Sequence, residues 1–177
     1  KVVFEHVTPD IILARDFEIS EFEEKTATLL CEHYYPAIVT QELVDCGNVI
    51  LGTSFGCDTS LSGPALKTTQ TLFGDTNALI TFSGERISGH LVVSANHSHL
   101  AKMYERNMGE ELDKITREEA GDLAGEIANQ VLGRFKNFFE AHSSKPFALG
   151  LPIVIYGTKV SIGYSTRRPT LILGFQE

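Results

Sequence analysis

Apolar residues recur with a helical period between residues 116 and 141, and this is the strongest pattern in the chain. The recurring positions are Ala120, Leu123, Ala124, Ile127, Ala128, Val131, Phe135 and Phe138. At about 100° per residue these side chains form one stripe, which must pack on a sheet or on another helix. Thr116 and Glu119 have the spacing of a capping box, so the predicted helix begins at this point.

Shorter patterns predict the other elements. Segments 76–83 and 87–95 flank a short turn and are expected to form a β-hairpin. Helices are expected at 20–35, which ends before Pro36, and at 96–109, with Asn96 as its cap. Further strands are predicted at 1–7, 150–157, 158–165 and 169–177. A strand or a hairpin is predicted at 44–58, with a loop at 58–64. The order indicates an α+β fold in which long helices pack on a mostly antiparallel sheet, in a single domain, residues 1–177.

The opposite face of the long helix is polar. Asp122, Glu126, Asn129 and Gly133 are spaced i, i+4, i+7 and i+11, so they lie close together and point away from the apolar stripe. The simplest interpretation is a solvated face, and the alternative is a face that meets another molecule. Three glycines in this helix each lower its stability by about 1 kcal/mol relative to alanine. Close approach of another backbone or helix would explain why they are tolerated.

Charge and cysteine content narrow the class of protein. The formal net charge is −8, which argues against a nucleic acid or an anionic membrane as the main partner. No apolar run approaches the roughly 18 residues that a membrane span needs. Three cysteines, Cys31, Cys46 and Cys57, suit a reducing cytoplasm better than a disulfide scaffold, and we expect them to be buried small hydrophobes.

Two weaker motifs are candidates for a catalytic site and a metal site. Gly52, Ser54 and Gly56 match the pattern of a hydrolase nucleophile elbow, but that motif needs a helix directly after it, and a loop is expected here. A turn is therefore the preferred interpretation. His97 and His99 would point in different directions on their predicted helix, so no metal site is expected there.

The spacing on the polar face resembles a known signature. Asp122, three residues, Glu126, two residues, Asn129, 22 residues and Pro152 are similar to the signature of the CheC/CheX/FliY family of chemotaxis phosphatases. Gly125, before the glutamate, is also typical of that family, as is Gly133, four residues after the asparagine. The order of elements over residues 75–177 resembles CheX, and with it a CheC-like superfamily fold.

The first part of the chain departs from the two-site members of the family. CheC-like proteins carry a second copy of the motif on an N-terminal helix. Here the helix near 20–35 offers Ser20 and Glu24, but Ala27 stands where the asparagine is required. Residues 1–74 therefore lack the motif, and the resemblance implies one site, as in CheX.

The resemblance implies a protein phosphatase that hydrolyses the aspartyl phosphate of a CheY-like receiver domain in chemotaxis or two-component signalling. Asn129 would orient the attacking water, and Glu126 would pair with a lysine of the receiver. The residues expected to bind or accommodate the partner are Asp122, Gly125, Gly133 and Pro152.

The same resemblance implies the cofactors and partners. The phosphorylated receiver would bring its own Mg²⁺, and this chain would need no metal or other cofactor. A cytoplasmic homodimer is expected. The alternative is a non-catalytic CheX-like adaptor or dimerisation module that binds a receiver or a flagellar-switch protein.

Overall fold

The computed structural model describes most of the chain after residue 36. The described residues are 37–58, 60–67, 71–84, 88–109, 115–141, 146–163 and 170–176. The strand predicted at 1–7 and the helix predicted at 20–35 lie outside these residues, as does Cys31. The described part is α+β with antiparallel pairing, which confirms the predicted fold class.

The larger sheet is built around β2 (Thr76–Ser83). On one side β2 pairs with β3 (Ser88–Ala95) along its whole length, which confirms the predicted hairpin. On the other side it pairs antiparallel with two short strands, β4 (Ala148–Leu149) and β5 (Ile153–Tyr156). The connection between these two strands, residues 150–152, passes beside the motif helix, as described below.

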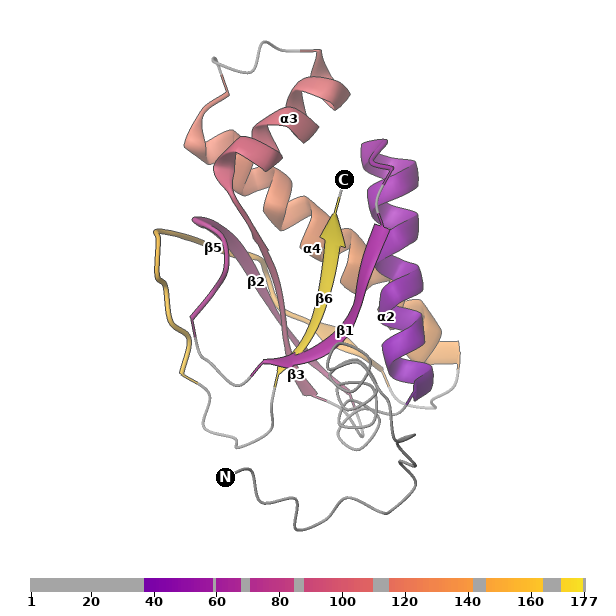
Figure 1. Cartoon of the computed structure of the whole chain (residues 1–177). Coiled ribbons are helices and arrows are strands. Elements are labelled where there is room, and N and C mark those ends of the chain that lie inside the picture. Colours follow the sequence, from indigo (N-terminus) through magenta and orange to yellow (C-terminus); the bar gives the residue numbers. More distant parts are fainter. Residues whose placement is uncertain are drawn as a thin grey trace, which may run out of the picture.

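Three helices accompany this sheet in the described part of the chain (Figure 1). The long helix α4 (Arg117–Ala141) packs against β2, β3 and β5. Both α2 (Ala37–Val49) and α3 (His97–Met108) pack against α4. A short π-helical turn, η1 (Ile50–Ser54), extends α2. None of the described helices has the length and apolar character needed to cross a membrane.

The core lies between α4 and the sheet. The first five residues of β2 are all buried, and the predicted stripe of α4 is buried from Ala120 to Phe135, with Phe138 at its partly exposed end. Aromatic rings pack together in this core near the C-terminal end of α4. The ring centroids of Phe82 and Phe147 lie 5.5 Å apart, and Phe139 stacks on Phe147 at 5.3 Å.

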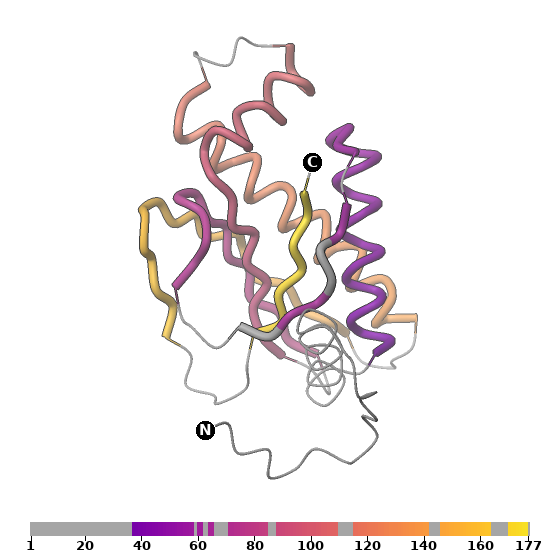
Figure 2. Tube along the Cα trace, in the orientation of Figure 1, coloured from indigo at the N-terminus to yellow at the C-terminus, as the bar shows by residue number. Residues whose placement is uncertain are grey.

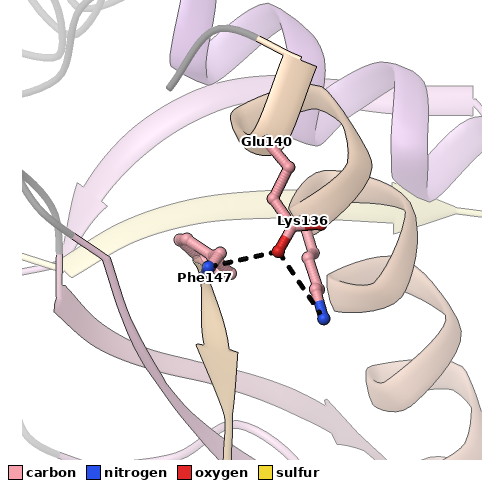
Figure 3. A network of polar contacts seen from close by, with 3 residues as sticks. All are labelled: Lys136, Glu140 and Phe147. Carbon is pink, nitrogen blue, oxygen red and sulfur yellow. Dashed lines mark hydrogen bonds and ion pairs between the residues drawn. The ribbon is translucent and has the colours of Figure 1, made fainter. Parts of the chain in front are cut away.

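The end of α4 is tied to the start of the strand that follows it (Figure 3). The Phe147 N–H donates a hydrogen bond to the Glu140 carboxylate at 3.2 Å. Lys136 forms an ion pair with the same carboxylate oxygen at 3.7 Å. Glu140 thus joins the last turn of the helix to the strand side of the core.

A second, two-stranded sheet joins segments that are far apart in the sequence (Figure 2). Strand β1 (Ser60–Lys67) pairs antiparallel with β6 (Thr170–Gln176). The phenyl ring of Phe175 in β6 lies over Gly47 of α2, where an added Cβ would come within 2.4 Å of the ring. The strand predicted at 169–177 is confirmed.

Two predictions for residues 44–64 are wrong. Where a strand or a hairpin was expected at 44–58, the structure has the second half of α2 and the π-helical turn. Strand β1 begins inside the loop expected at 58–64. Three glycines suggested breaks, yet Gly47 is helical and serves the contact with Phe175. Strand β1 exists because β6 pairs with it, and its register shifts between Ser62 and Ala65, the stretch that holds Pro64.

The predictions at 158–165 and for the Asn96 cap also need correction. Lys159 has φ 63° in a turn, and the described part of this segment contributes only an isolated bridge from Ser161 to Thr71. Asn96 stands at the N-cap of α3 as predicted, but its side chain forms no capping hydrogen bond. The Asp75 carboxylate accepts the His97 N–H instead, at 2.7 Å.

Candidate functional site

The N-terminus of α4 is held by the predicted capping box. The Thr116 N–H donates to the Glu119 carboxylate at 2.7 Å, and the Glu119 N–H donates back to the Thr116 hydroxyl at 3.2 Å. The hydrogen bond from the Thr116 backbone, followed by that from its hydroxyl at 2.7 Å, lowers the pKa of Glu119. The helix that carries the candidate site therefore has a fixed start.

The outer face of α4 is arranged as the sequence predicted. Asp122, Glu126 and Asn129 are exposed, and Gln130 and Gly133 are partly exposed. The other residues between Asp122 and Gly133 are buried. An alanine Cβ at Gly133 would have no atom within 4 Å outside its own helix. An acid, a second acid, an amide and an open position therefore follow one another along about three turns of helix.

Strand β5 lies along one flank of this face and accounts for the other two glycines. A Cβ at Gly121 would come within 2.0 Å of the Tyr156 hydroxyl and 2.9 Å of Val154 Cγ1. A Cβ at Gly125 would lie 3.5 Å from Pro152 Cβ. Gly125 is buried, so it brings the helix close to Pro152 and presents no surface of its own to a partner.

The two ends of the motif are therefore joined in space. Pro152 is exposed and comes just before β5. It lies against Gly125, the residue that immediately precedes Glu126 in α4. The 22 residues between Asn129 and Pro152 in the sequence include the rest of α4 and β4. This geometry explains why a glycine and a proline so far apart belong to one pattern.

Glu126 has a partner that the sequence did not reveal. The Gln130 amide donates a hydrogen bond to the Glu126 carboxylate at 2.7 Å, one helical turn away. This bond restrains the carboxylate and leaves its second oxygen to accept from another molecule. Among the hydrogen bonds between described residues, none involves the side-chain amide of Asn129.

Tyr156 and Arg117 lie at the N-terminal end of this face of α4. The Arg117 guanidinium lies over the Tyr156 ring, with Cζ 4.6 Å from the ring centroid. Burial raises the pKa of Tyr156, as do the negative charges of Glu118 and Asp122, and Arg117 partly offsets the rise. The phenol thus stays protonated beside Asp122. Sequence reasoning missed this pair, because only the packing of β5 on α4 brings it to the face.

The other sequence candidates remain apart from this face. Ser54 is exposed at the end of the π-helical turn, and the next element is a strand, so the helix that an elbow requires is missing among the described residues. Cys46 and Cys57 are buried, as predicted, and neither forms a disulfide bond within the described part of the chain. Within the described part of the chain, no group of three or more His, Cys, Asp or Glu side chains is placed to hold a metal ion.

Comparison with known proteins identifies the family. Residues 76–176 match the family model of the chemotaxis phosphatase CheX, which is more than half of the chain. The chain belongs to the CheX family. The matched region begins with β2 and ends with β6, so it contains the whole face of this CheX-family protein, including the motif from Asp122 to Pro152.

Solved structures share the fold of this CheX-family protein. A CheC-like superfamily protein from Shewanella sp. PV-4 is 24% identical, with a TM-score of 0.69 over 80% of this chain and 90% of that chain. Chemotaxis protein CheX from Vibrio vulnificus is 20% identical, with a TM-score of 0.69 over 80% and 92%. CheX in the CheX–CheY–BeF3–Mg²⁺ complex from Borrelia burgdorferi is 17% identical, with a TM-score of 0.57 over 77% and 97%. A search of curated protein sequences found no match.

Proposed function

We propose that this CheX-family protein hydrolyses the aspartyl phosphate of a CheY-like receiver domain. The observation that carries the proposal is the exposed face of α4, on which Glu126 and Asn129 stand outside the core and follow Gly125, the residue that approaches Pro152. A convex helical face suits a folded protein substrate better than a small molecule, which would need a cleft. Membership of a chemotaxis phosphatase family supports the reaction class.

Asn129 is the proposed catalytic residue. Its amide cannot act as a base, but its oxygen can accept a hydrogen bond from water and its nitrogen can donate one to a phosphoryl oxygen. Hydrolysis of a phosphoryl group depends mainly on positioning and on stabilising charge, so one oriented water is a sufficient contribution from this side. In the attack, the water oxygen bonds to phosphorus, the bond to the aspartate oxygen breaks, and the regained carboxylate and inorganic phosphate are the products.

Glu126 is proposed to hold the receiver in register. Its carboxylate already accepts the Gln130 amide at 2.7 Å and can accept a charge-assisted hydrogen bond from a lysine of the partner. Gln130 would thereby fix the orientation from which Glu126 meets that lysine. Asp122 adds negative charge one turn earlier, and the open position at Gly133 leaves room for the docked surface.

The metal in this proposal belongs to the substrate. The receiver would bring Mg²⁺ together with its phosphorylated aspartate, and we propose no cofactor for this chain. The Borrelia burgdorferi relative was crystallised with CheY, BeF3 and Mg²⁺, and such an assembly would have a phosphoryl group in the place of BeF3. A homodimer of this chain is part of the same proposal.

The test is loss of phosphate from a phosphorylated CheY-like receiver of the same organism, followed with and without this protein. Removing one oriented hydrogen-bonding group from a catalytic site typically lowers the rate by about 10² to 10³. We expect Asn129→Ala to lose activity to that extent. The matched control is Asn137→Ala, because Asn137 is an exposed asparagine two turns further along the same helix.

The outcomes separate the proposal from its alternative. If the wild-type protein does not accelerate phosphate loss, the phosphatase proposal is wrong. If it binds the receiver all the same, the non-catalytic adaptor becomes the better description. If Asn129→Ala is as fast as the wild type while activity is real, then hydrolysis occurs without the water that we assign to Asn129.

A further inference from the structure

The outer face of α2 and its π-helical turn repeats the spacing found on α4. Four exposed residues on this face are spaced i, i+4, i+7 and i+11: Gln41, Asp45, Asn48 and Gly52. The four motif positions of α4, from Asp122 to Gly133, have the same spacing. In both helices the third position is an asparagine and the fourth is a glycine, and an acid stands three residues before the asparagine. The face of α2 therefore presents the same kinds of group in the same order.

The acid on each helix is restrained by a glutamine one turn away. The Gln41 amide donates a hydrogen bond to the Asp45 carboxylate at 3.0 Å. On α4, the corresponding bond runs from the Gln130 amide to Glu126 at 2.7 Å. The glycine after the asparagine is open in both helices, because a Cβ at Gly52 would meet only a carbonyl oxygen at 3.9 Å. A docked surface would thus find an oriented acid, an amide and free space on α2 as well.

The helix behind Asn48 is held in place from its buried side. Gly47, the residue before Asn48, lies under the ring of Phe175 in β6. Cys46 is fully buried, and α2 packs against α4. A side chain on a packed helix is placed more precisely than one on a loop. Asn48 and Asp45 therefore project from a rigid element, as positioning a water molecule requires.

The two faces differ in ways that affect geometry more than chemistry. The acid on α2 is an aspartate, which is one methylene shorter than the glutamate on α4. Val44 stands where α4 has a glycine, and Thr71 stands where the motif has its proline, so α2 does not carry the full motif. Misplacing a reacting group by about 1 Å can slow a positioned reaction by about 10²-fold. A receiver held by the shorter acid should therefore be hydrolysed slowly on α2.

We infer that α2 carries a second site for the phosphorylated receiver, in which Asp45 pairs with the receiver's lysine and Asn48 orients the water. This inference rests on the proposed phosphatase function, and it concerns a face outside residues 76–176, which match the family model. The water oxygen bonds to phosphorus and the bond to the aspartate oxygen breaks, as on α4. The α2 site binds the receiver and turns it over about 10²-fold more slowly, so Asn129 supplies nearly all of the wild-type rate.

The experiment begins with the double variant Glu126→Ala/Asn129→Ala, in which α4 cannot work. Turnover is measured with a phosphorylated CheY-like receiver of the same organism. We expect the double variant to retain about 1% of the wild-type rate, above that of the receiver alone. Adding Asn48→Ala should return the rate to that of the receiver alone. Adding Asp45→Glu instead should raise the remaining rate about tenfold, because it restores the length of the acid.

The control in the same background is Asn107→Ala, because Asn107 is an exposed asparagine near the end of α3, and it should leave the remaining rate unchanged. A double variant that hydrolyses no faster than the receiver alone would overturn the α2 site and leave the proposal for α4 intact. A remaining rate that Asn48→Ala does not lower would also overturn it. Absence of turnover in the wild type would overturn the phosphatase proposal, and the α2 site with it.

Discussion

The glycines of α4 differ in their surroundings, and alanine substitution should therefore have opposite effects on stability. Gly121 is buried against β5, whereas an alanine Cβ at Gly133 would meet nothing within 4 Å outside its own helix. Neither glycine has a positive φ, so both conformations suit alanine. The perturbation is a single methyl group at each position in the same helix.

The magnitudes follow from two terms. Alanine is better than glycine by about 1 kcal/mol in a helix interior, and Gly133→Ala should gain that amount because nothing opposes it. At Gly121 the methyl would sit 2.0 Å from the Tyr156 hydroxyl and 2.9 Å from Val154 Cγ1. Forcing an extra methyl into a packed contact typically loses about 1–3 kcal/mol, so Gly121→Ala should end about 1 kcal/mol less stable than the wild type.

Urea denaturation at constant pH measures this difference. We expect the two variants to differ by about 2 kcal/mol, with unchanged m-values, which corresponds to about 4–8 °C in Tm for a domain of this size. Adding Tyr156→Phe to Gly121→Ala removes the nearest atom and should recover part of the loss. If Gly121→Ala were as stable as Gly133→Ala, β5 could not pack on the helix as closely as described, and the place of Pro152 beside the site would fall with it.

The remaining predictions concern groups outside that contact. Thr116→Ala should lower the free energy of unfolding, measured in urea, by about 1 kcal/mol. Because the pKa of Glu119 is lowered in the folded state, the contribution of Glu119 to stability is present above its ordinary pKa and is lost as the pH falls. Glu119→Gln should remove that acid dependence. Burial, followed by the charge of Glu42, raises the pKa of Cys46 to about 12 from 9.0. The contribution of the Cys46 thiol to stability is therefore complete below pH 9 and declines above it. Cys46→Ala should make the stability of the protein less dependent on pH in this alkaline range. Glu140→Ala should lower stability by about 1 kcal/mol, a loss that Glu140→Gln avoids because an amide oxygen still accepts the N–H of the next strand.

Periodic patterns predicted the motif helix and the hairpin well, for physical reasons. The apolar stripe of α4 is long enough for one period to dominate, and its capping box is local in sequence. The β2–β3 pair is joined by a short turn, so its pattern is local as well. The prediction of an exposed polar face is correct for the same reason. Because the apolar stripe fixes which side of the helix is buried, Asp122, Glu126 and Asn129 must point away from it.

Elements that depend on distant partners were missed. Gly47 suggested a break in the helix because the residue that packs on it, Phe175, lies in the last strand, far away in the sequence. Strand β1 looked like a loop because β6 completes its hydrogen bonds. At the site, Tyr156 and the close approach of Pro152 to Gly125 could not be derived from spacing, because only the packing of β5 on α4 brings them together. The glycine that precedes the glutamate was grouped with the partner-facing residues, and its burial shows a role inside the fold.

The pairing of β1 with β6 has a consequence for the order in which this protein assembles. The candidate face is made from one continuous stretch, from β2 to β5, whose contacts join residues that are moderately close in the chain. The pair Ser60 and Gln176, by contrast, closes a loop that contains this entire stretch. Contacts of high sequence separation form slowly because the chain entropy must be lost before they are made. We therefore expect the terminal strands to join late, onto a helix and sheet that have already brought Asn129 and Pro152 to the same face.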